Sequence, residues 1–149
     1  MMPTTVRVLV VEDFEAYRDV VTSLINRYPA FVVIGEAVDG QEAVEKAEQL
    51  VPDVVLMDIS LPKLNGLAAA RRIKSLATPP KVVFLTAHSD IELMQEAFRL
   101  GACGFILKTH AASQLLPALE AAARDEIFFG ADIGRPRKVI PLPTIMFQK

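Results

Sequence analysis

The sequence of 149 residues has a single cysteine, only two histidines and no tryptophan. The lone thiol, Cys103, excludes an internal disulfide framework and fits a reducing cytoplasm, which is the location that we expect for this protein. So few cysteines and histidines exclude a zinc site built from pairs of these residues. From the sequence, no serine and histidine pair is expected to be placed for acyl transfer. The chemistry of this protein must therefore come from other side chains.

Long apolar runs and a strong net charge are also missing. No stretch approaches the roughly 18 apolar residues of a membrane span, so no membrane association is expected. No secretory signal opens the chain, because Glu12 and Asp13 interrupt its first apolar run. The formal net charge of −2 gives no broad electrostatic footprint for nucleic acid. The length suits one domain with a real hydrophobic core.

Strand-like and helix-like segments alternate from residue 5 to about residue 126. Five apolar runs of strand length begin near residues 6, 31, 54, 81 and 103. Segments with helical spacing of apolar residues separate these runs. Because the strand runs are continuously apolar, both faces of the sheet should be covered, which is typical of parallel strands. The pattern predicts an α/β fold, a (βα)5 doubly wound parallel sheet of five strands.

The helical periodicity ends near residue 126. The last helix is predicted to begin near Ser113, a favourable N-cap residue. Residues 127–149 contain three prolines and no period, so we interpret them as a C-terminal tail or linker. Three basic residues, at 135, 137 and 138, would give only weak and sequence-blind contacts with phosphates. A helix-turn-helix does not fit between these prolines, so no specific DNA binding by this chain is expected.

Polar side chains collect where four of the five predicted strands end. Glu12 and Asp13 follow the first strand, Asp58 the third, Thr86 the fourth and Lys108 the fifth. Right-handed crossovers place these ends on one edge of the sheet, where doubly wound proteins bind their ligands. Clustered carboxylates repel one another unless a cation lies among them, and oxygen ligands suit Mg²⁺. The sequence therefore predicts a magnesium site at this edge.

The same edge has the groups that hold a phosphoryl group. A metal ion and Lys108 would neutralise the phosphoryl oxygens, and the Thr86 hydroxyl would donate a hydrogen bond to one of them. A carboxylate that the metal ion leaves over would then be available as the nucleophile. Transfer of a phosphoryl group to one of these carboxylates is the reaction that these residue types indicate.

In these motifs the chain resembles the receiver domain of two-component response regulators over residues 5–126. It is most similar to the NarL/FixJ group, but without the helix-turn-helix output domain of that group. The resemblance implies a flavodoxin-like sheet with strand order 2-1-3-4-5. It also implies a role for each site residue: Glu12, Asp13, Asp58 and the backbone carbonyl of Ser60 as metal ligands, Asp58 as phosphoacceptor with Thr86 and Lys108, and Phe105 with Thr86 as the switch.

The function implied by the resemblance is a signalling switch of a two-component system or phosphorelay, activated by phosphorylation. Asp58 would accept the phosphoryl group from a sensor histidine kinase or a phosphotransfer protein with Mg²⁺ as cofactor. Such a domain is not a conventional enzyme, although it catalyses its own phosphotransfer and slow dephosphorylation. The resemblance implies an output partner, or a second copy, on the surface formed by the fourth helix, fifth strand and fifth helix.

Other interpretations remain at this stage. A phosphohydrolase of the haloacid dehalogenase type also has a nucleophilic aspartate after a buried strand, but Ser60 stands where that class needs a second acid. An interaction module that works without phosphorylation would be expected to lack some of the site residues. His88, two residues after Thr86, either influences dephosphorylation from above the site entrance or faces solvent in its loop.

Overall fold

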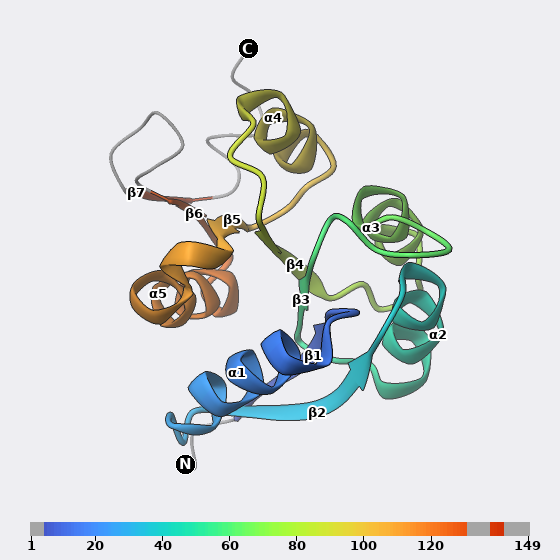
Figure 1. Cartoon of the computed structure of the whole chain (residues 1–149), viewed down its shortest axis with the longest axis horizontal. Helices are drawn as coiled ribbons and strands as arrows, with labels where there is room; N and C mark the ends of the chain where they lie inside the picture. The colour runs from blue at the N-terminus through green and yellow to red at the C-terminus, as the bar shows by residue number, and fades with distance from the viewer. Residues whose placement is uncertain (1–4, 131–137, 142–149) are drawn as a thin grey trace.

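The structure is a computed structural model of the whole chain and describes residues 5–130 and 138–141. Figure 1 shows helices on both faces of a central sheet, with α1 and α5 on one face and α2, α3 and α4 on the other. The strands are β1 (Val6–Val11), β2 (Phe31–Ala37), β3 (Val54–Met57), β4 (Lys81–Thr86), β5 (Gly104–Leu107), β6 (Glu126–Phe129) and β7 (Lys138–Pro141). The helices are α1 (Glu15–Asn26), α2 (Gly40–Leu50), α3 (Gly66–Lys74), α4 (Ile91–Arg99), the 3-10 helix η1 (Lys108–His110) and α5 (Ala111–Ala123).

The sheet has the order β2-β1-β3-β4-β5-β6-β7. Strands β1 to β5 are all parallel to their neighbours, which confirms the doubly wound sheet and the predicted order 2-1-3-4-5. The C-terminal ends of these five strands therefore lie on one edge. That edge carries the polar residues singled out in the sequence.

Two apolar cores form because the strands bury side chains on both faces. Every residue of β3 and of β5 is buried. One core lies between the sheet and helices α2, α3 and α4, and includes Met57, Phe84 and Phe105. The other lies between the sheet and helices α1 and α5, and includes Leu56 and Ile106. Neighbouring residues of β3 and of β5 thus belong to opposite cores, which fixes the register of these strands.

Local signals in the sequence set the start of α2. The Asp39 side chain accepts a hydrogen bond from the Glu42 N–H at 2.7 Å, and Glu42 Oε1 accepts one from the Val38 N–H at 2.7 Å. The first bond caps α2 by satisfying a backbone donor that the first turn leaves free, and the second holds the residue before the N-cap. At the other end, the Arg7 guanidinium donates to the Leu50 carbonyl oxygen at 2.8 Å and so ties α2 to β1.

The sheet continues beyond the five predicted strands. In the parallel pair of β5 and β6, Gly104 lies opposite Phe128 and Phe105 opposite Phe129. Ile127 packs in one core and Phe128 in the other, and both are almost completely buried. Residues 127–129, which we expected to begin the tail or linker, are part of strand β6. A run of four residues is too short to show a period, and the prolines that follow obscure it. The domain boundary at residue 126 stays a prediction.

The start of α5 also differs from the prediction. The helix begins at Ala111 rather than near Ser113, because η1 leads directly into it. The Ser113 hydroxyl donates to the His110 carbonyl oxygen at 3.3 Å instead of capping the helix. Arg135 and Arg137 of the basic cluster lie outside the described residues, as do Pro136 and Pro143. None of the helices in the described part of the chain has the length and apolar character needed to span a bilayer.

Replacing Phe128 by alanine tests whether β6 belongs to the folded domain. Phe128 is 1% exposed, so Phe128→Ala should lower the free energy of unfolding by about 3–5 kcal/mol. Phe14→Ala is the matched control, because Phe14 is 65% exposed and its loss should change stability by no more than about 0.5 kcal/mol. Urea unfolding measures both. Equal, small effects of the two substitutions would show that β6 does not pack on the sheet.

Candidate functional site

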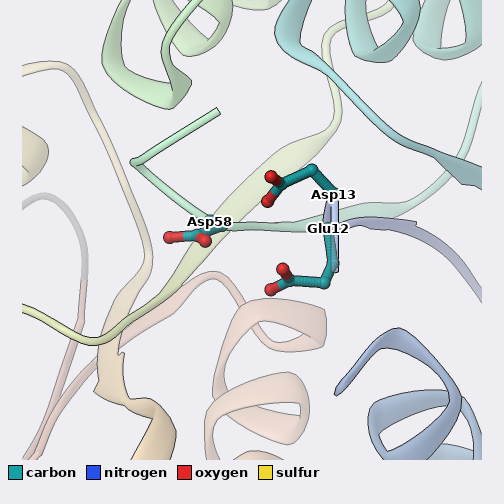
Figure 2. A group of neighbouring side chains, drawn as sticks. All are labelled: Glu12, Asp13 and Asp58. Atoms are coloured by element: carbon teal, nitrogen blue, oxygen red, sulfur yellow. The ribbon is translucent and has the colours of Figure 1, made fainter. Parts of the chain in front are cut away.

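Three carboxylates meet at the C-terminal edge of the sheet. Glu12 and Asp13 follow β1, and Asp58 follows β3. Figure 2 shows their side chains turned toward one shared space. One oxygen from each of these carboxylates lies within 4.8 Å of the others. The prediction that strand ends would bring these acids together is therefore confirmed by the geometry.

Two of the three acids are taken out of water. Glu12 is 3% exposed and Asp58 5%, whereas Asp13 is exposed. Glu12 Oε2 accepts a hydrogen bond from the Phe14 N–H at 3.0 Å. Burial raises the pKa of Glu12, and the ion pair with Lys108 only partly opposes this shift. Ionised Glu12 thus depends on nearby positive charge.

Lys108 supplies that charge from the end of β5. Its ammonium nitrogen lies 2.6 Å from Glu12 Oε1 and 2.9 Å from Asp58 Oδ2. Burial alone would lower the pKa of Lys108, but the hydrogen bonds to the two carboxylates outweigh this effect and raise it. Lys108 is therefore protonated at neutral pH. It links β1, β3 and β5 through one cation.

The donor set fits a small divalent cation. Oxygen atoms on opposite sides of Mg²⁺ lie about 4.2 Å apart, so carboxylate oxygens within 4.8 Å need only a small rotation or an intervening water. With all three acids ionised and Lys108 protonated, the cluster has an excess of two negative charges. A divalent ion would neutralise that excess, and carboxylates are the hard ligands that Mg²⁺ prefers. Glu12, Asp13 and Asp58 could therefore hold such an ion.

The loop after β3 passes close to Asp58. The Ser60 N–H donates to Asp58 Oδ1 at 3.2 Å, which places the Ser60 backbone at the site. A Cβ atom on Gly66 would lie 2.2 Å from the Asp58 carbonyl oxygen, so only glycine fits where α3 begins. The Asn65 side chain caps the same helix by accepting from the Ala68 N–H at 2.9 Å. These contacts hold the loop in place beside the Asp58 carboxylate.

The two residues predicted to form the switch are both buried. Thr86 ends β4 and has no exposed surface, and its hydroxyl oxygen accepts a hydrogen bond from the His88 N–H at 3.1 Å. Phe105 lies opposite Phe84 in the pairing of β4 with β5, and its ring is fully buried in the core beside α4. In this structure Phe105 therefore has the inward position.

Two further contacts at the site are found only in three dimensions. The Tyr17 hydroxyl of α1 donates to the Lys108 carbonyl oxygen at 2.9 Å, and the Lys108 ammonium lies 4.9 Å from the centre of the Tyr17 ring. Burial raises the pKa of Tyr17, so its hydroxyl stays protonated and able to donate. His88 Nε2 lies 3.0 Å from Ser60 Oγ and joins the loops after β3 and β4. No spacing in the sequence indicates the first contact, which depends on how α1 packs against the end of β5.

Comparisons with known proteins agree with this geometry. The family described as response regulator receiver domain matches residues 8–120. The chain belongs to this family. It is 35% identical over 127 residues to the transcriptional regulatory protein YdfI of Bacillus subtilis, covering 85% of this chain and 59% of YdfI. The chain thus spans little more than half the length of that relative.

Solved structures of the family are similar to this chain. The response regulator domain of Thermotoga maritima CheB is 38% identical, with a TM-score of 0.76 over 80% of this chain and 97% of that domain. The receiver domain of a putative response regulator NarL from Mycobacterium tuberculosis is 31% identical, with a TM-score of 0.71 over 79% of this chain and 98% of that domain. The predicted resemblance to receivers, including the NarL group, is confirmed. The comparisons do not favour a phosphohydrolase or a nonphosphorylated interaction module.

Lys108→Met tests the dependence of Glu12 on its cation. The pKa of Glu12 is already above the 4.5 of an ordinary glutamate, so the folded state holds this proton at a pH where the unfolded state has lost it. Stability therefore falls as pH rises from 4.5 through the folded pKa. Without Lys108 the pKa should rise further, and each extra unit should cost about 1.4 kcal/mol at neutral pH.

Urea unfolding in EDTA across the range from pH 5 to 7 measures this difference. Lys74→Met is the control, because Lys74 is exposed on α3. The Lys108→Met profile should fall more steeply than that of the wild type or the control. Parallel profiles for all three proteins would contradict this account of the site.

Proposed function

We propose that this chain is a switch of two-component signalling in which Asp58 accepts a phosphoryl group from a sensor histidine kinase or a phosphotransfer protein. One observation carries the proposal. The Asp58 carboxylate ends a buried strand with the Lys108 ammonium at 2.9 Å and with oxygens of Glu12 and Asp13 within 4.8 Å. A structural ion pair would need one acid and one base, whereas three acids with one base favour a divalent cation and a phosphoryl group.

The residues divide the chemistry among themselves. One oxygen of Asp58 attacks phosphorus, and the bond from phosphorus to the donor's imidazole nitrogen breaks. Lys108 transfers its hydrogen bond from Asp58 Oδ2 to a phosphoryl oxygen, and Thr86 donates from its hydroxyl to another. A bound Mg²⁺ would neutralise further charge on the phosphoryl oxygens. Water can later attack the same phosphorus and break its bond to the Asp58 oxygen, which releases inorganic phosphate and restores the carboxylate in a slow dephosphorylation.

The metal ligands in this proposal are the carboxylates of Glu12, Asp13 and Asp58 with the Ser60 backbone carbonyl. Asp13 is the best direct ligand, because it is exposed and lies outside the ion pairs of Lys108. Glu12 is buried against Lys108 and would act from further away, through water. This division explains why two adjacent acids follow β1.

Phosphorylation would act on the rest of the molecule through Thr86 and Phe105. Movement of the Thr86 hydroxyl toward the phosphoryl group would break its bond with the His88 N–H and loosen the loop before α4. Phe105 is inward in this structure, and we propose that it also has an outward position, so that the two positions make a bistable element that a bound group biases. Phe105 lies opposite Phe129, so a change in β5 would also reach β6. We propose that the partner surface is formed by α4, β5 and α5, and it borders β6, which pairs with the outer edge of β5.

Asp58→Asn should abolish phosphorylation by acetyl phosphate in the presence of Mg²⁺. The amide is a poor nucleophile and lacks the charge that holds the metal ion. Incorporation of the phosphoryl group is measured by mass spectrometry of the intact chain. Release of the phosphoryl group by hydroxylamine is the evidence for an acyl phosphate. Asp19→Asn, on the exposed face of α1, is the matched control and should react like the wild type. EDTA should stop the reaction in both reactive proteins.

Uptake of hydroxylamine-sensitive phosphate by Asp58→Asn at the wild-type rate would overturn the assignment of Asp58 as phosphoacceptor.

The same samples also test the partner surface, because phosphorylation is expected to strengthen self-association or partner binding. Light scattering that gives one mass in both states, with no partner binding in either, would argue against this surface.

A further inference from the structure

Tyr17 contacts both the backbone and the side-chain ammonium of Lys108. Its hydroxyl donates to the Lys108 backbone carbonyl at 2.9 Å, and its ring faces the ammonium at 4.9 Å. The same carbonyl accepts the Ala111 N–H of the turn that leads into α5. One aromatic side chain thus touches both the backbone and the charged group of the lysine.

The position of Tyr17 is itself fixed by its neighbours. Arg18, the next residue, donates to the Glu12 carbonyl oxygen at 2.8 Å and contacts Glu36 of β2 at 3.2 Å. These contacts join the first turn of α1 to β1 and β2. The Tyr17 ring also packs against the core between the sheet and α5. Tyr17 is therefore held relative to the end of β1, where the acids lie.

The Lys108 ammonium has acids on one side and an aromatic face on the other. The lysine side chain is only 19% exposed, and its two carboxylate contacts involve Glu12 and Asp58. An aromatic face attracts a cation and displaces water from it. A lysine side chain has several freely rotating bonds, so without this support its ammonium would visit other positions. The Tyr17 ring therefore keeps the Lys108 ammonium in contact with the two carboxylates.

We propose that Tyr17 is a positioning residue for Lys108, which keeps the ammonium at Glu12 and Asp58 so that a phosphoryl group arriving on Asp58 meets a cation already in place. This inference rests on the proposed function for its effect on the reaction rate, although the contact itself can be tested without it. The competing roles for Tyr17 are core packing alone and docking of a protein phosphodonor. With a small phosphodonor in place of a protein, docking cannot affect the measured rate.

The test measures the initial rate of phosphorylation by acetyl phosphate for Tyr17→Phe and Tyr17→Leu, each alone and combined with Lys108→Met. Tyr17→Phe keeps the ring and loses one hydrogen bond, so the rate should fall about threefold to fivefold. Tyr17→Leu loses both contacts, so its initial rate of phosphorylation should fall about tenfold. In the Lys108→Met background neither substitution should slow the reaction further, because Tyr17 acts through Lys108.

A merely structural Tyr17 would give the same factor in both backgrounds or no effect in either, and both results overturn the proposal. Urea unfolding checks that all variants are folded. The ring contact is tested separately by NMR. The methylene protons of Lys108 next to the ammonium should be shifted upfield in the wild type and in Tyr17→Phe, and should lose this shift in Tyr17→Leu. Lys81, at the opposite edge of the sheet, is the internal control.

The two readouts separate this inference from the proposed function. A wild-type protein that takes up no phosphoryl group contradicts the proposed function, while the NMR shift still decides whether Tyr17 holds Lys108. Lys108 protons that are unshifted in the folded wild type contradict the positioning role, whatever the phosphorylation result.

Discussion

The ion pairs of the Lys108 ammonium with Glu12 and Asp58 are the interaction on which the rest of the site depends. Two carboxylates buried within a few ångströms of one another are unstable as a pair of anions, because each is desolvated and each repels the other. Lys108 stabilises both at once, at 2.6 and 2.9 Å. Glu12, Asp58 and Lys108 still leave one negative charge uncompensated, and Asp13 raises this excess to two. This excess of negative charge favours a divalent cation, which the three carboxylates could hold.

The fold holds these charged groups close together by placing each of them at the end of a rigid strand. Strands β1, β3 and β5 are buried on both faces and deliver Glu12, Asp58 and Lys108 to one edge. Strand β6 closes the side of β5 and buries Phe128 in the same core as α5. Helix α1 brings Tyr17 into contact with Lys108. The charged groups thus have little freedom to separate, although they sit at the surface end of the sheet.

Sequence reasoning predicted the parts of this structure that depend on pattern and strand ends. Continuous apolar runs predicted a parallel sheet, and the residue types after each run predicted the cluster of Glu12, Asp13, Asp58 and Lys108. Strand β6 was missed because a strand of four residues has no period to detect and prolines follow it. The contact of Ser60 with His88 joins two loops, and loop conformation is not encoded by spacing. The contact of Tyr17 with Lys108 depends on the angle at which α1 packs, which also has no local signature.

The most direct test of the central claim is a crystal structure of the protein with Mg²⁺ and beryllofluoride, a mimic of the phosphoryl group. We expect beryllium on Asp58, Mg²⁺ bound by Asp13 and Asp58, and the Lys108 ammonium moved from Asp58 Oδ2 to a fluoride. Thr86 should donate to a second fluoride and lose its contact with the His88 N–H. Beryllofluoride or Mg²⁺ bound elsewhere, or a Lys108 ammonium still paired with Asp58 Oδ2, would contradict the account.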